Sequence, residues 1–102
     1  MKYYQVLISA EDKGQATTIL DALLKKKLIL GGPILEGPAK FWWKDKIVDM
    51  SHYCYILTYT TEKLKQEVED EYKRISAEEV PMISFIVFSG NPELQKLIDN
   101  TL

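Results

Sequence analysis

The chain has few of the residues on which enzymes and metal sites most often depend. Cys54 is its single cysteine and His52 its single histidine among 102 residues. One cysteine excludes an intramolecular disulfide and is typical of a reducing compartment. No serine lies in a nucleophile-elbow motif, and Gly31-Gly32-Pro33 is too short for a phosphate-binding loop and lacks its lysine. We therefore expect a protein that is not an enzyme.

Charge of one sign and long apolar runs are also missing. Thirteen Lys and Arg residues oppose fifteen Asp and Glu residues, and the lysines are scattered among the acids. No basic stripe therefore indicates binding to nucleic acid or to an anionic membrane. The N-terminal run becomes polar at Ser9, too early for a signal peptide or a membrane span. We expect a cytoplasmic protein.

The size and composition are those of one soluble globular domain. Hydrophobic residues make up 46% of the chain and charged residues 27%. A second hydrophobic core would not fit in 102 residues. We therefore predict a single domain over residues 1–102.

The first half of the chain alternates strand and helix signals. Residues 5–8 predict a strand, and the polar segment ending at Asp12 suits the start of a helix. Apolar residues at helical spacing continue that helix from residue 13 to Leu28. A second strand over 34–43, broken at Gly37-Pro38, then follows.

The second half predicts a long strand over 47–60, a helix, a strand over 82–89 and a last helix. Thr61 is the expected cap of the helix that ends near Ser76. Asn91 is the expected cap of the last helix, with Pro92 at its first position. The order is that of an α+β, ferredoxin-like βαββαβ sandwich with a C-terminal helix.

The stretch from Phe41 to Ile47 predicts the tip of a long β-hairpin. Trp42 and Trp43 precede a polar Lys-Asp-Lys turn, and paired aromatic rings need a large surface to cover them. The strand that follows is apolar on both faces, so its own helices can cover only one of them. We therefore expect the protein to associate with itself.

Several motifs in this chain occur in the order and separation typical of one family. They are the helix end Leu23-Leu24-Lys25-Lys26-Lys27-Leu28, the hairpin Trp43-Lys44-Asp45-Lys46-Ile47, Thr60-Thr61-Glu62, Glu79-Val80-Pro81 and Gly90-Asn91. Together they resemble the CutA family of divalent-cation tolerance proteins over nearly the whole chain. The resemblance implies a homotrimer with inward-facing sheets, an architecture like the P-II signalling proteins, and a role tied to copper or another divalent metal.

The resemblance also implies a cleft between subunits. The residues that we expect at this interface or cleft are Trp42, Trp43, Lys46, Tyr59, Glu79 and Pro81. For the two tryptophans, strand alternation predicts one ring in the core and one at the interface. The alternative is that they stack a ligand ring in the cleft.

The chain departs from the family pattern at polar positions. Gly31 and Pro33 stand where relatives usually carry cysteine and asparagine, His52 falls near the usual glutamate, and Thr58 replaces a lysine. In the segment His-Pro-Tyr-Glu-Val-Pro-Glu only Glu79, Val80 and Pro81 match, because Ser76, Ala77, Glu78 and Met82 fill the other places. The chain therefore resembles a divergent member.

Met50, His52 and Cys54 are the candidate metal ligands. A period of two predicts that they share one strand face. Thioether, imidazole and thiolate groups suit copper(I) and zinc. The alternative is that Met50 and Cys54 pack in the core and His52 is a hydrogen-bonded strand histidine.

The leading hypothesis is a trimeric, non-enzymatic binding or regulatory module linked to divalent-cation tolerance. The alternative is a P-II-like trimer that binds a small ligand or a protein partner and has no metal role. A third hypothesis is a hydrolase or isomerase that uses Glu79 as a base, which requires a raised carboxyl pKa in the cleft.

Overall fold

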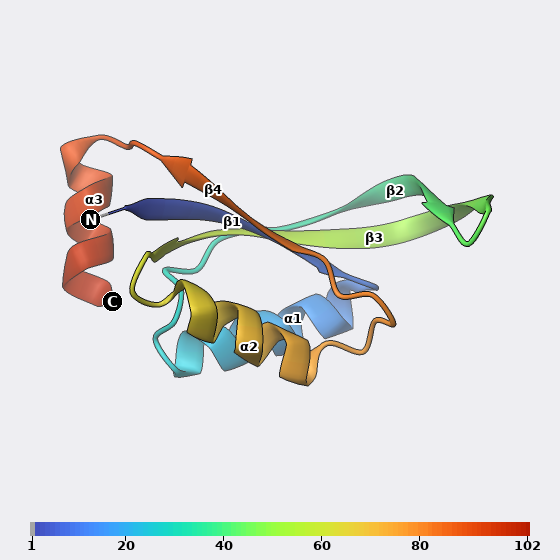
Figure 1. The fold of residues 1–102 in the computed structure, drawn as a ribbon, viewed down its shortest axis with the longest axis horizontal. Coiled ribbons are helices and arrows are strands. Elements are labelled where there is room, and N and C mark those ends of the chain that lie inside the picture. The colour runs from blue at the N-terminus through green and yellow to red at the C-terminus, as the bar shows by residue number, and fades with distance from the viewer. Residues whose placement is uncertain (1) are drawn as a thin grey trace.

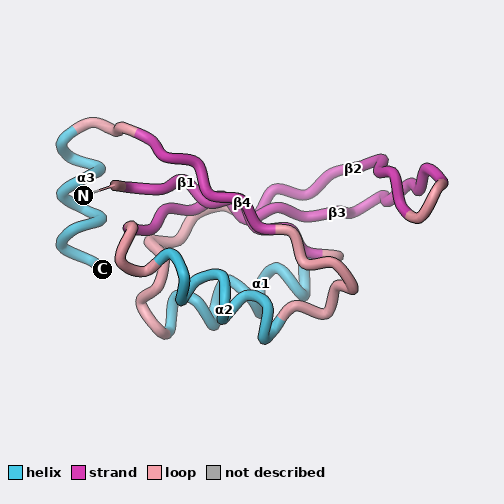
Figure 2. Tube along the Cα trace, in the orientation of Figure 1, coloured by secondary structure: helices cyan, strands magenta, loops and turns pink. Residues whose placement is uncertain are grey.

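The computed structural model describes residues 2–102, which form one antiparallel sheet and three helices (Figures 1 and 2). The elements are β1 (Tyr3–Ala10), α1 (Lys13–Lys25), β2 (Ile34–Trp43), β3 (Lys46–Thr61), α2 (Lys65–Ile75), β4 (Ile83–Phe88) and α3 (Pro92–Thr101). The strand order is β2-β3-β1-β4, and α1 and α2 lie side by side on one face. The predicted α+β, ferredoxin-like fold is confirmed.

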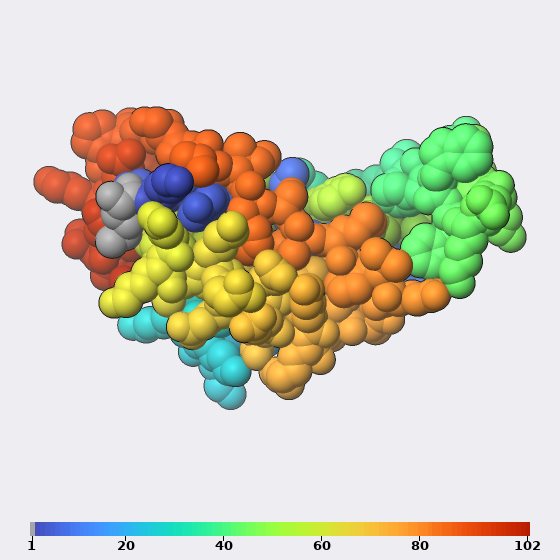
Figure 3. Space-filling model, in the orientation of Figure 1, coloured from blue at the N-terminus to red at the C-terminus, as the bar shows by residue number. Residues whose placement is uncertain are grey.

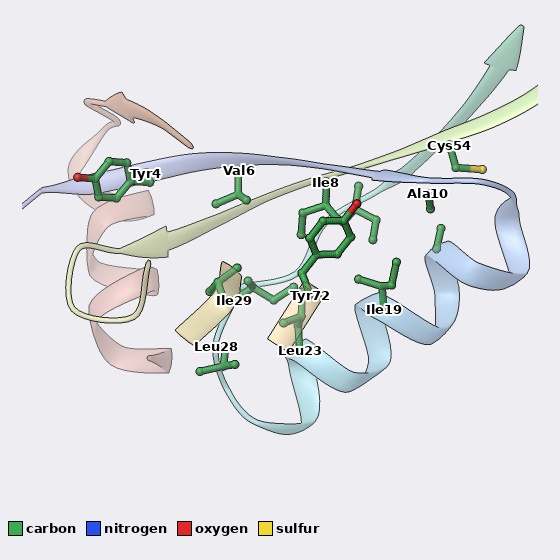
Figure 4. Packing of buried hydrophobic residues seen from close by; sticks show 13 residues of the cluster. Tyr4, Val6, Ile8, Ala10, Ile19, Leu23, Leu28, Ile29, Cys54 and Tyr72 are labelled. Atoms are coloured by element: carbon green, nitrogen blue, oxygen red, sulfur yellow. The ribbon is translucent and has the colours of Figure 1, made fainter. Parts of the chain in front are cut away.

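The covered face of the sheet forms the core because alternate residues of β1 point toward α1 and α2. Val6, Ile8 and Ala10 are fully buried. They pack with Ile19 of α1 and Tyr72 of α2, whose ring points toward the sheet (Figure 4). This period of two is the pattern that the apolar run of β1 predicts.

The other side of the sheet is apolar but has little cover in a single chain. We call this side the open face; Leu7, Leu35, Tyr55, Leu57 and Ile86 belong to it by strand register. Leu35 is 52% exposed and Ile86 is 48% exposed. The prediction of two apolar faces on the long strand is therefore confirmed, and α1 and α2 cover only one of them.

Helix α3 packs at the end of the sheet where β1 begins (Figure 1). Its Ile98 is fully buried, and the Tyr3 hydroxyl donates to the Asp99 carboxylate at 2.8 Å. Asn91 caps this helix by accepting from the Leu94 amide at 3.0 Å, and Pro92 follows in the first turn. Both predictions about the start of the last helix are confirmed.

The hairpin of β2 and β3 extends well beyond the helices (Figure 1). The molecule measures 43 × 24 × 20 Å. Its radius of gyration is 14.1 Å, above the value of about 13 Å for a compact chain of this length. Lys44 and Asp45 form the two-residue turn with φ of 46° and 70°, the left-handed conformation of a type I′ turn.

A β-bulge separates this projecting arm from the body of the sheet. Gly37 pairs with Tyr53, but Ala39 pairs with Met50, so two residues of β3 face Pro38 alone. Pro38 has no N–H to donate to the ladder, which favours an irregularity here. We call residues 38–52 the arm. The extra residue reverses the alternation of side chains along the arm.

Two element boundaries differ from the sequence expectations by more than two residues. Helix α1 ends at Lys25 rather than Leu28, because Lys27 adopts φ 54° and the Leu28 amide bonds back to the Leu23 carbonyl. Thr61 is not a helix cap: β3 continues through it, and α2 starts after Leu64 without a side-chain cap. Asp12 caps α1 as expected, accepting from the Gln15 amide at 2.8 Å.

None of the helices within residues 2–102 has the length and apolar character that crossing a lipid bilayer requires.

Candidate functional site

The arm and the loop between α2 and β4 enclose a cleft of about 380 Å³. The two segments lie side by side at one end of the molecule (Figure 3). The lining comprises Phe41, Trp42, Trp43, Met50 and Tyr53 from the hairpin, Ala77, Glu78, Glu79, Val80 and Met82 from the loop, and Glu11 from the turn after β1. One wall is therefore mainly aromatic and the other carries carboxylates.

The bulge places the aromatic wall on one side of the arm. Register puts Phe41, Met50 and Tyr53 on the same side, because the extra residue in β3 restores Met50 to the side of Tyr53. The Phe41 and Tyr53 rings meet edge to face with centroids 4.8 Å apart. Such pairs hold each other in place, so this wall is rigid.

The carboxylate of Glu78 is held by hydrogen bonds from two strands. The Ser9 hydroxyl donates to it at 2.9 Å and the Tyr53 hydroxyl at 3.3 Å. Beneath it, the Tyr72 hydroxyl donates to the Ser9 carbonyl at 2.9 Å and accepts from the Met82 amide at 3.1 Å. This network fixes the loop against the end of β1.

Burial and the nearby Glu78 carboxylate raise the pKa of Tyr53 to about 12. Burial also raises the pKa of Tyr72. Both phenols therefore stay protonated at neutral pH and act as hydrogen-bond donors. The carboxylate wall keeps a fixed arrangement across the physiological pH range.

At the tip of the arm, Lys44 contacts two residues of the cleft lining. Its ammonium lies 3.0 Å from one Glu79 carboxylate oxygen and 5.4 Å from the centre of the Trp43 ring. Lys44 and Glu79 are each 65% exposed, so the ion pair itself adds little stability. The contact shows instead that an ammonium group fits between this ring and this carboxylate.

The three candidate metal ligands are not brought together. Met50 lies on the other side of β3 from His52 and Cys54, so the predicted common face is wrong for Met50, and the bulge is the reason. Cys54 is fully buried, whereas the His52 side chain is 76% exposed and lies 3.9 Å from Glu36.

The chemistry of the donor set does not fit a preformed metal centre within one chain. Burial, together with the carboxylates of Glu36 and Asp12, raises the pKa of the Cys54 thiol and so disfavours the thiolate that binds metal. Across residues 2–102, no three His, Cys, Asp or Glu side chains are grouped so that they could hold a metal ion. Binding of copper or zinc by His52 and Cys54 stays a prediction.

The predicted interface residues fall in two places. Trp42 is 75% exposed and faces Ile47 across the hairpin, on the opposite side from Trp43. Trp43 and Glu79 line the cleft, and Lys46 pairs with Trp43 in the hairpin register.

The other two predicted residues lie toward the sheet. Tyr59 contacts Phe88, with ring centres 5.0 Å apart. Pro81 lines a shallow hollow of about 610 Å³ that extends onto the open face with Leu7 and Leu35. Neither tryptophan belongs to the buried core, so the expectation of one core ring is wrong: the arm extends beyond α1 and α2.

Two of the departures from the family pattern contact each other. The Thr58 hydroxyl accepts from the Gly31 amide at 3.0 Å and donates to the Gly31 carbonyl at 3.1 Å. The next residue, Gly32, lies so close to β3 that a Cβ there would be 1.9 Å from the Leu57 carbonyl oxygen. These residues therefore hold the loop after α1 against the sheet.

The family model described as CutA1 divalent ion tolerance protein matches residues 4–101. This chain belongs to the CutA1 divalent ion tolerance family. A comparison with curated protein sequences gave no match. Membership agrees with the resemblance that the hairpin and the Glu79-Val80-Pro81 motif indicate.

Solved structures of CutA1 proteins share the fold. The periplasmic divalent cation tolerance protein CutA from Archaeoglobus fulgidus is 29% identical with a TM-score of 0.88, and 97% of each chain is covered. CutA1 from Ehrlichia chaffeensis is 23% identical with a TM-score of 0.89, covering 99% of this chain and 96% of its own. CutA1 from Oryza sativa is 17% identical with a TM-score of 0.90, covering 99% and 94%.

Sequence reasoning missed Ser9, Tyr53, Tyr72 and Glu78 as parts of the site. Ser9 and Glu78 are 69 residues apart in the chain, and no local pattern links them. The nearest signal in the sequence is the pair of adjacent acids Glu78-Glu79, a pattern that is more typical of a solvated turn. Only the return of the loop across the end of β1 brings these groups together.

Proposed function

We propose that this CutA1-family protein is a non-enzymatic binding module that works as a homotrimer in the cytoplasm. The carrying observation is the open face, whose apolar side chains Leu35 and Ile86 are about half exposed in the single chain. An apolar sheet face of this kind gains stability when a second copy covers it. The trimeric state follows the family resemblance.

A binding role rather than catalysis is supported by how the cleft groups are used. Glu78 already accepts two hydrogen bonds, and Glu79 is paired with Lys44. Both carboxylates are thus held in place by hydrogen-bonding or ion-pair partners, which suits recognition of a ligand. Burial of the free thiol Cys54 agrees with a reducing compartment such as the cytoplasm.

Two versions of this function differ in the role of metal. In the first, the module takes part in tolerance of copper or another divalent metal through contacts that include His52 and Cys54. In the second, a P-II-like trimer binds a small ligand or a protein partner without metal. The burial of Cys54 and the opposite orientation of Met50 favour the second version.

Native mass spectrometry of the reduced protein tests the proposal, with and without stoichiometric copper(I) and zinc. We expect a trimer at micromolar concentration. A monomer under the same conditions contradicts the proposed assembly. Metal uptake in multiples of three that is lost in a His52→Ala, Cys54→Ser double variant supports the first version. A trimer whose metal affinity is unchanged by that double variant removes these two residues from any metal role.

A further inference from the structure

The tip of the arm already holds an ammonium group in a recognition geometry. The Lys44 ammonium is within 6 Å of the Trp43 ring centre and forms an ion pair with Glu79 at 3.0 Å. An aromatic face and a carboxylate together recognise an organic cation better than either group does alone. Lys44 therefore acts as a tethered stand-in for an amine.

The cleft behind Lys44 continues with the same chemistry. Phe41 and Met50, which are partly exposed, present apolar surface that suits an alkyl chain, and Glu78 provides a second carboxylate, held by the buried Tyr53. Its volume of about 380 Å³ is within the range of small-molecule pockets, which is roughly 300–1,000 Å³. Glu11 adds a third carboxylate, and the lining contributed by residues 2–102 includes no basic side chain. The cleft is therefore complementary to a small cation with an apolar body.

We propose that the cleft between the arm and the α2–β4 loop binds a linear alkyl diamine. One ammonium of the ligand takes the place of the Lys44 ammonium between Trp43 and Glu79. The alkyl chain lies along Phe41 and Met50, and the second ammonium is directed to the carboxylate of Glu78. This inference rests on the ligand-binding version of the proposed function and names the class of its ligand.

The aromatic wall is the reason for choosing an amine rather than a metal ion. Divalent metals bind through several oxygen, nitrogen or sulfur donors arranged around one point. Among residues 2–102, the cleft carboxylates are not grouped with other His, Cys, Asp or Glu side chains so that they could hold a metal ion, whereas the aromatic rings opposite them attract an ammonium. An alkyl diamine uses both walls of the cleft.

Isothermal titration of the purified full chain with 1,4-diaminobutane tests this proposal. We expect saturable binding that Glu79→Gln and Trp43→Leu each weaken by roughly tenfold. Lys44→Gln should tighten binding severalfold, because the ligand no longer competes with a tethered ammonium. Asp49→Asn is the matched control, since Asp49 is an exposed arm carboxylate paired with Lys40 at 3.8 Å. Its affinity should equal that of the unchanged protein.

The outcomes that overturn the inference are distinct from those that overturn the trimer. Equal affinity for uncharged 1,4-butanediol, or equal affinity in Glu79→Gln and Asp49→Asn, contradicts amine recognition. A trimer that binds no diamine at millimolar concentration overturns the inference and leaves the proposed assembly intact. Diamine binding by a monomer supports the inference and contradicts the assembly.

Discussion

The two faces of the four-stranded sheet differ in how far their apolar side chains are buried. On the covered face, Ile8 and Ile56 are fully buried by the chain's own helices. On the open face, Leu35 and Ile86 are about half exposed, although these side chains are equally apolar. The hydrophobic driving force is the same per unit area on both sides. What differs is that the chain has helices for only one face, which leaves the second face open to the association that we propose.

The strongest way to break this contrast is to place a charge on the open face. Ile86→Lys should convert the proposed trimer to a monomer, because a buried unpaired charge costs about 3–5 kcal/mol at each interface. Val87→Lys is the matched control. Val87 is the next residue of β4, its side chain is 57% exposed, and it points to the other side of the strand. Light scattering after size-exclusion chromatography measures the change. A trimer that survives Ile86→Lys places the interface elsewhere.

Truncating neighbours on β3 sharpens the contrast. Ile56→Ala should lower the free energy of unfolding by about 2–5 kcal/mol, because it leaves a cavity in the core. Leu57→Ala, on the open face, should lower the free energy of unfolding clearly less. The two substitutions are compared one at a time, each in the Ile86→Lys background, which we expect to be monomeric. Urea unfolding followed by circular dichroism gives both values. Equal losses for the two variants show that the open face is packed within the monomer.

The ion pairs of Glu71, which lie among the helices on the covered face, should weaken in acid. Arg74 and Lys26 both donate to this carboxylate, at 2.9 Å and 3.1 Å, and they lower its pKa from 4.5 to about 2. A pKa that is depressed on folding stabilises the protein above the unfolded pKa, and this stability is lost as pH falls toward 2. The contact joins α2 to the end of α1.

The urea midpoint measured from pH 6 down to pH 2 tests this contribution. The urea midpoint of Glu71→Gln should decrease less between pH 5 and pH 2 than that of the unchanged protein. Glu67→Gln is the matched control, because Glu67 is an exposed carboxylate on the same helix. Identical pH profiles for Glu71→Gln and the unchanged protein mean that the ion pairs do not contribute.

The smallest expected effect lies at the turn of the arm. Asp45 has φ of 70°, and glycine adopts this conformation without steric cost. Asp45→Gly should therefore raise the free energy of unfolding by less than about 1 kcal/mol. Thermal unfolding measures the gain, and diamine affinity should not change because Lys44 and Trp43 are kept. A lower melting temperature contradicts the assigned turn type.

The sequence predicted the elements well where the signal is local. The apolar alternation of β1, the cap Asn91 and the polar turn after Trp43 each act within a few residues. The prediction ended β3 at Thr60 and made Thr61 a helix cap, but pairing of Thr61 with Tyr3 outweighs its preference for a cap. Local patterns cannot show which distant strand is available as a partner.

The site was less predictable for the same reason. The common face of Met50, His52 and Cys54 follows from a period of two, and one extra residue opposite Pro38 invalidates it. Gly37-Pro38 did signal an irregularity, but not which strand would carry the extra residue. The hydrogen bonds of Glu78 depend on a loop returning across β1, so they have no signature in the sequence.

The bulge opposite Pro38 gives the arm a direction that can change in evolution separately from the residues that line the cleft. Deleting one of the two β3 residues opposite Pro38 would remove the extra residue, and Met50 would keep its pairing with Ala39 and therefore its side of the arm. Residues 54–61, which pair with β1, would keep their register. A single-codon deletion would thus change the bend of the arm while leaving both the residues of the cleft wall and the folding core in place.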